Sequence, residues 1–197
     1  MKLTVTFSSQ GRMLEAALFL PPQSTSELSP ALLFEGTMTG ATAMVTEHIA
    51  HDLSEEGFVC MVLDHAFYGD DESSAQSWES PYKRVEDIKA GLKILSEQAT
   101  TDRESIVGVG VSVGAEYLAR AIHESSVCKG FVMVQGPFDD AQNHVGNLDI
   151  PTLIVNENNL DAAVDEISIW VKTLLNRPGN MKPLNKSAPF DWSNYDK

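Results

Sequence analysis

Residues 105–118 constrain the fold of this chain more than any other stretch of its sequence. The first part, 106–111, is apolar and β-branched and is interrupted only by glycine, which predicts a strand buried on both faces of a sheet. The second part, 115–123, has apolar residues at helical spacing and predicts a helix. A buried strand that leads directly into a helix indicates an α/β fold built on a mostly parallel sheet.

The junction between this strand and this helix has the sequence Gly110-Val-Ser-Val-Gly114, a G-x-S-x-G pattern. Small residues two positions before and after the serine let the strand and the helix pass close to each other. We therefore expect Ser112 to have backbone dihedral angles outside the usual regions and to hold its hydroxyl clear of the sheet. The pattern is typical of a nucleophile elbow, and the alternative is a structural turn in a glycine-rich protein.

Hydrophobic periodicity divides the rest of the chain into alternating strands and helices. Strands are predicted at residues 3–7, 13–20, 31–34, 58–63, 131–134 and 151–155, and helices at 45–56, 82–98 and 162–175. The first two strands form a hairpin through the turn 8–11. The order of the elements predicts a mostly parallel, twisted sheet with helices on both faces.

Ligands in such folds bind at the carboxyl ends of the strands. The polar residues that follow predicted strands are Glu35, Asp64, Ser112, Gln135 and Asn156. We expect the main pocket at this edge, with His65 or the loop 136–144 at its rim. Its expected lining residues are Glu35, Gly36, Thr37, Ser112 and Val113.

Composition limits the compartment and the partners of the chain. Its 197 residues and 43% hydrophobic content suffice for one sizeable core, so residues 1–197 are expected to form a single domain. The net charge of -14 argues against nucleic acid and anionic membrane surfaces as partners. The N-terminus lacks the apolar region of a signal peptide and no run reaches transmembrane length, so we expect a cytoplasmic location. Cys60 and Cys128 lie beside apolar strand residues and are predicted to be buried thiols.

Four segments resemble the α/β-hydrolase superfamily, and within it most closely the dienelactone-hydrolase-like branch. They are the stretch 108–117, the loop 63–69 with its D-x-x-x-x-G pattern, the helix start 81–88 and the strand 151–155. The resemblance runs from about residue 3 to about residue 175. It implies an α/β-hydrolase fold with an eight-stranded sheet whose first strands are antiparallel, and it places Ser112 at the nucleophile position. The short segment 137–150 leaves no room for a large cap domain.

Two catalytic positions of the family depart from its pattern in this chain. Asn159 stands where the resemblance places the catalytic acid, and Asp161 could serve only if the loop is shifted. Pro189 stands at the position of the catalytic histidine, and the last histidine of the sequence is His144. The triad implied by the resemblance is therefore incomplete or rearranged.

Without the family histidine, a base that activates Ser112 must come from elsewhere. A glutamate occupies a place similar to that of Glu35 in dienelactone hydrolases, so Glu35 could act as base or gate. The alternative for Glu35 is a hydrogen-bonded carboxylate with a supporting role. His65 and His144 are the histidine candidates, each with the alternative of a surface or loop residue.

The resemblance also implies an oxyanion hole formed by the N–H of Val113 and an N–H of Gly36 or Thr37. No residue pattern predicts a metal ion or a cofactor. The acidic run 70–72 is typical of a solvated loop, and Gly108-x-Gly110 lacks the third glycine of a dinucleotide-binding fingerprint.

The sequence is compatible with two functions. The first is a serine hydrolase that acts on a small ester, thioester or lactone through Ser112 with a displaced base. Its hydrolysis should be weak, because Pro189 has no titratable group. The second is a triad-degenerate homologue that binds a small molecule or performs non-hydrolytic chemistry in the same crevice. In both cases the partner is a small molecule, with no nucleic acid and no membrane, and a homodimer is left open.

Overall fold

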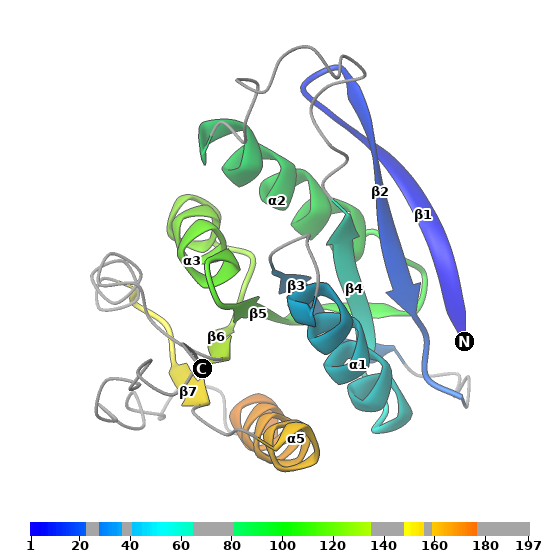
Figure 1. Cartoon of the computed structure of the whole chain (residues 1–197), viewed down its shortest axis with the longest axis vertical. Helices are drawn as coiled ribbons and strands as arrows, with labels where there is room; N and C mark the ends of the chain where they lie inside the picture. The colour runs from blue at the N-terminus through cyan, green and yellow to red at the C-terminus, as the bar shows by residue number, and fades with distance from the viewer. Residues whose placement is uncertain (23–27, 37–40, 65–80, 135–147, 156–158, 177–197) are drawn as a thin grey trace.

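A seven-stranded sheet runs through the part of the molecule that the computed structural model describes, which is residues 1–22, 28–36, 41–64, 81–134, 148–155 and 159–176 (Figure 1). The strands are β1 (Lys2–Ser9), β2 (Arg12–Phe19), β3 (Ser29–Glu35), β4 (Val59–Asp64), β5 (Thr101–Val111), β6 (Gly130–Val134) and β7 (Thr152–Val155). They lie in the order β1-β2-β4-β3-β5-β6-β7. The helices of this part are α1 (Ala41–Glu55), α2 (Pro81–Ser96), α3 (Gly114–Glu124) and α5 (Leu160–Asn176).

The strand directions divide the sheet into an antiparallel edge and a parallel body. β1 pairs antiparallel with β2, and β2 pairs antiparallel with β4. The pairs β3–β4, β3–β5, β5–β6 and β6–β7 are all parallel. At the hairpin turn, Gln10 (φ 48) and Gly11 (φ 78) both have the left-handed backbone that a two-residue turn between twisted strands requires. The predicted hairpin and the mostly parallel sheet with antiparallel first strands are confirmed.

Helices cover both faces of the sheet (Figure 1), and each face carries its own hydrophobic layer. On one face, Leu33 of β3 and Leu118 of α3 belong to a buried cluster that also includes residues of α2. On the other face, Phe34 of β3, Ile49 of α1 and Trp170 of α5 belong to a second buried cluster. Because β3 and β5 are covered on both faces, their sequences are apolar at almost every inner position. Among the described residues, no helix is long and apolar enough to cross a membrane.

Each predicted strand and helix is present, with ends that differ by a few residues. The largest difference is at β5, which begins at Thr101 and not at 106, because Thr101 pairs with Ser29 of β3. Because residues 102–104 are polar, the sequence pattern does not indicate that the strand begins before them. The implied eighth strand and the segment 135–147, where a cap could be inserted, lie outside the described residues.

The junction between β5 and α3 has the strained backbone that the sequence predicts. Ser112 has a φ of 54, in the left-handed region that residues with a side chain rarely adopt. A Cβ atom on Gly110 would collide with the backbone of Ala115 at the start of α3. The chain therefore reverses from strand to helix in a space that only glycine permits at position 110.

The end of β3 packs directly against the same junction. A Cβ atom on Gly114 would lie 2.6 Å from the carbonyl carbon of Glu35 and 2.8 Å from the Cα atom of Gly36. These contacts are with backbone atoms, which cannot rotate away. Gly114 thus sets how closely α3 approaches β3, and it brings Gly36 beside the turn that carries Ser112.

We expect Gly114→Val to destabilise the fold by roughly 2 kcal/mol or more, because its side chain must displace the backbone of β3. Urea denaturation followed by circular dichroism measures the free energy of unfolding. Ala162→Val, at a half-buried position in the first turn of α5, is the control for placing a β-branched residue in a helix. Equal unfolding free energies for the two variants would contradict the close packing at Gly114.

The two thiols should be unreactive in the folded protein. Cys60 and Cys128 are 0% and 4% exposed, and burial raises the pKa of Cys128 to about 12 and that of Cys60 well above its usual value. Since the thiolate is the reactive form, we expect no rapid reaction with Ellman's reagent in buffer and complete reaction of both thiols in guanidinium chloride. Fast labelling of the native protein would contradict this burial.

Candidate active site

Ser112 stands at the carboxyl edge of the sheet and is partly exposed. Its backbone N–H donates a hydrogen bond to the carbonyl oxygen of Val134 at the end of β6 (3.0 Å). Its own carbonyl oxygen accepts one from the N–H of Ala115 (3.0 Å). The turn is therefore fixed from both sides by backbone bonds, which leaves the side chain of Ser112 outside the sheet ladder.

Val113 offers a backbone donor next to this serine. It occupies the N-cap position of α3, and its carbonyl oxygen accepts the N–H of Glu116 (3.2 Å). Within the part of the chain that the structure describes, the N–H of Val113 donates no hydrogen bond. An N–H that is unpaired at a helix N-terminus favours negative charge beside it. This is the donor that the sequence resemblance implies for an oxyanion hole.

A buried ion pair holds the end of β3 beside this turn. The guanidinium of Arg84, on α2, donates from Nε to the Oε1 atom of Glu35 (2.6 Å). Its Nη2 atom donates to the carbonyl oxygen of Gly36 (2.5 Å). Arg84 and Glu35 are 1% and 0% exposed, so the pair is shielded from solvent. One cation thus fixes both the side chain of Glu35 and the backbone of the next residue.

The third neighbour of Arg84 is an aromatic ring of α3. The guanidinium carbon lies 4.5 Å from the ring centroid of Tyr117, within the range of a cation–π contact. Arg84 therefore connects α2, the end of β3 and α3. Hydrogen bonds between charged groups are stronger than neutral ones, and breaking such a pair in the interior leaves an uncompensated charge. Because Arg84 also donates to the carbonyl oxygen of Gly36, the position of Gly36 depends on α2.

Sequence reasoning missed Arg84, although the helix contains a signal for it. Arg84 continues, at helical spacing, the buried stripe of Ile88, Leu92 and Leu95. An arginine on the apolar face of a helix requires a buried acidic partner. Asp87, one turn further along α2, follows the same rule, because it is 0% exposed and pairs with Arg12 of β2 (3.2 Å).

The structure brings Ser112, Val113, Glu35 and Gly36 together, and it places Asp161 beside two residues of α1. Asp161 lies in the first turn of α5, and ligand atoms of His48, Asp52 and Asp161 lie within 4.8 Å of one another, a grouping that could hold a metal ion.

The position expected for the acid serves as a helix cap. The Oδ1 atom of Asn159 accepts the N–H groups of Asp161 (2.9 Å) and Ala162 (3.4 Å). Asparagine is among the residues preferred at this position, so its side chain satisfies the start of α5.

Several sequence-predicted site residues lie outside the described part of the chain. They are Thr37, His65, His144 and Pro189. Of the other histidines, His48 and His51 lie on α1, where each is in ion-pair range of Asp52.

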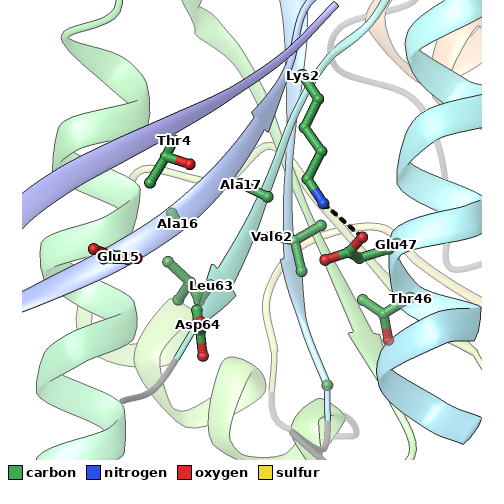
Figure 2. Close-up of a pocket in the computed structure, with 11 residues that line it drawn as sticks. Lys2, Thr4, Glu15, Ala16, Ala17, Thr46, Glu47, Val62, Leu63 and Asp64 are labelled. Atoms are coloured by element: carbon green, nitrogen blue, oxygen red, sulfur yellow. Dashed lines mark hydrogen bonds and ion pairs between the residues drawn. The ribbon is translucent and has the colours of Figure 1, made fainter.

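The pocket expected around Ser112 includes Thr37 and the loop 136–144, which lie outside the described residues, so it stays a prediction. A pocket of about 310 Å³ is lined by residues 2, 4, 15–17, 36, 46–47 and 62–64, and of the five expected lining residues it contains Gly36 alone (Figure 2). We call it the α1-side pocket. Glu35 cannot line it because the alternation along β3 directs this side chain to the opposite face, where Arg84 buries it. Neighbouring residues at the end of β3 therefore face opposite sides of the sheet.

Comparisons with known proteins give relatives of limited identity. No family model matches the chain. The quorum-quenching protein AidA of Acinetobacter baumannii is 27% identical over 139 residues, which cover 70% of this chain and 44% of that protein. The chain spans less than half the length of the curated relatives it matches.

Solved structures give a closer likeness in shape. Dienelactone hydrolase from Anabaena variabilis has a TM-score of 0.65 at 17% identity, with 87% of this chain and 81% of that chain covered. XC6422 from Xanthomonas campestris is described as an α/β serine hydrolase without a lid. It has a TM-score of 0.58 at 15% identity, with 91% of this chain and 97% of that chain covered. At this identity the likeness concerns the fold. With its strand order and strained β5–α3 turn, the chain has the α/β-hydrolase fold.

Proposed function

We propose that this chain is a serine hydrolase that cleaves a small ester, thioester or lactone through Ser112. The observation that carries the proposal is the left-handed backbone of Ser112 in a G-x-S-x-G turn at the carboxyl edge of a parallel sheet. Strain of this kind persists only where the surroundings impose it, and it gathers at reactive sites. The names of similar structures, a dienelactone hydrolase and a serine hydrolase, support the same class of reaction.

In the proposed reaction, the Oγ atom of Ser112 attacks the carbonyl carbon of the substrate while its proton passes to a base. The carbonyl oxygen becomes an oxyanion, which the N–H groups of Val113 and Gly36 would stabilise. The tetrahedral intermediate collapses, and the alcohol or thiol leaves with the proton from the base. Water, deprotonated by the same base, then attacks the acyl group, releases the acid and restores the serine.

We assign the base to His65 or His144 in preference to Glu35. A guanidinium beside a carboxylate stabilises its ionised form, which makes the carboxylate a weaker base. His123 is too far away, because at 1.5 Å per residue it stands roughly 16 Å along α3 from Ser112. A base at His65 or His144 is compatible with the buried pair of Glu35 and Arg84.

A second candidate is a triad-degenerate homologue that binds a small molecule in the same crevice. The observation in its favour is the role of Asn159, which caps α5 where the family has its catalytic acid. Asp161 lies in the first turn of α5, beside His48 and Asp52. This candidate predicts binding without Ser112-dependent turnover.

Hydrolysis of p-nitrophenyl acetate separates the two candidates. We expect slow turnover that falls to the background rate in Ser112→Ala, because the alanine has no nucleophile. Ser105→Ala, in the same strand, is the matched control, and its rate should be unchanged. We also expect His65→Ala or His144→Ala to be inactive and Glu35→Gln to retain activity. A rate that is the same in Ser112→Ala as in the unmodified protein would refute the hydrolase.

Arg84 should act as a positioning residue for the oxyanion donor at Gly36. Arg84→Lys retains the positive charge but loses the planar fork that reaches Glu35 and Gly36 together. We expect kcat to fall about tenfold or more with KM little changed, since a displaced oxyanion donor weakens binding of the transition state alone. Arg120→Lys on α3 is the matched control, and thermal unfolding checks that both variants fold. A fall in stability with an unaltered kcat would show that Arg84 has only a structural role.

A further inference from the structure

The α1-side pocket lies on the face of the sheet that α1 and α5 cover, next to its antiparallel edge (Figure 2). Its floor follows the strand register, in which Thr4 of β1 lies beside Ala17 of β2, and Ala17 lies beside Val62 of β4. Ala17 and Val62 are only partly buried, because α1 packs over β3 and β4 and leaves the hairpin side open. The pocket therefore has a small, apolar floor.

The walls of the pocket carry an excess of negative charge. Glu15 and Asp64 lie directly opposite each other in the register of β2 and β4, and both are exposed. Within the described part of the chain, neither forms an ion pair. Lys2 is the one cation of the described lining, and its Nζ atom pairs with the Oε2 atom of Glu47 at 2.8 Å (Figure 2). Glu15 and Asp64, which have no ion-pair partner among the described residues, therefore place two carboxylates in the lining of the same pocket.

The pocket is connected to the proposed reaction centre through Gly36. This residue lines the pocket, and its Cα atom lies within 2.8 Å of the position that a Cβ atom of Gly114 would take. Gly114 follows Ser112 by two residues. Gly36 therefore belongs both to the lining of the pocket and to the backbone packed beside the turn of Ser112.

We infer that the α1-side pocket binds a cationic end of the substrate, such as a quaternary ammonium group. This inference rests on the proposed hydrolase function and names its substrate class. Methyl groups of the cation would lie on Ala17 and Val62, and Glu15 and Asp64 would attract its charge. A substrate with a carboxylate at the same end would meet two like charges, which disfavours its binding.

Three acetate esters that differ in the charge of their alcohol part test this inference. They are acetylcholine, the neutral 3,3-dimethylbutyl acetate and the anionic acetate ester of 4-hydroxybutanoate. We expect kcat/KM to fall in this order, by about tenfold or more from the cationic to the anionic ester, as two carboxylates in reach of the charge require. The difference should shrink as salt is added, because salt screens exposed charges.

Variants locate the preference in the pocket. In Glu15→Gln/Asp64→Asn the ratio between cationic and anionic esters should approach one. Lys2→Met should increase the ratio, because Glu47 then loses its partner. The control is Glu97→Gln/Glu104→Gln, which removes two exposed carboxylates outside the pocket and should keep the ratio of the unmodified protein. An unaltered ratio in Glu15→Gln/Asp64→Asn would overturn the inference.

Failure of the inference and failure of the proposed function give different results. Equal kcat/KM for the three esters, with hydrolysis abolished in Ser112→Ala, would overturn the inference and leave the hydrolase standing. If hydrolysis does not depend on Ser112, the hydrolase is wrong, and binding tests the pocket on its own. Saturable amide shifts of Ala17 and Val62 with choline, but not with butyrate, in nitrogen-15 NMR spectra would support the pocket. Equal shifts with both, or none, would overturn it.

Discussion

The geometry around Ser112 depends on one close approach, in which the start of α3 packs against the backbone at the end of β3. Gly114 makes this approach possible because a Cβ atom there would overlap the carbonyl group of Glu35. The same approach brings Gly36 beside the turn that holds Ser112 in its left-handed conformation. Packing alone thereby brings the turn of Ser112 and a backbone segment from a neighbouring strand together.

A buried cation, the guanidinium of Arg84, holds together the elements that pack around the turn of Ser112. Arg84 binds Glu35 and the carbonyl oxygen of Gly36, and it stacks on Tyr117, so three elements share one buried cation. Because β3 alternates between faces, this buried pair lies on the α2–α3 side, and the α1-side pocket opens on the other. Glu35 thus pairs with Arg84 on one face, while the next residue, Gly36, lines the α1-side pocket on the other.

The sequence predicts the elements and the strained turn because these follow from local rules. Alternating apolar residues predict the strands at 3–7 and 13–20, and the apolar run 106–111 predicts a buried strand. The glycines around Ser112 predict its strained turn. The sequence does not predict the partner of Arg84 or the α1-side pocket, because both depend on which side chains from separate elements lie on the same face of the sheet. The α1-side pocket contains only Gly36 of the five residues expected around Ser112, and Asp161 lies beside His48 and Asp52. A candidate acid or base is therefore harder to predict than the proposed nucleophile, whose turn is defined by its own sequence.

The central claim is that Ser112 is the reactive group of this protein, and its covalent capture is the most direct measurement. The folded protein is incubated with a fluorophosphonate probe, which phosphonylates activated serines, and the adduct is located by peptide mass spectrometry. We expect one adduct per chain, on Ser112, and none after unfolding in guanidinium chloride, since activation depends on the folded site. An unmodified Ser112 after prolonged incubation, or an adduct on another serine alone, would contradict the claim.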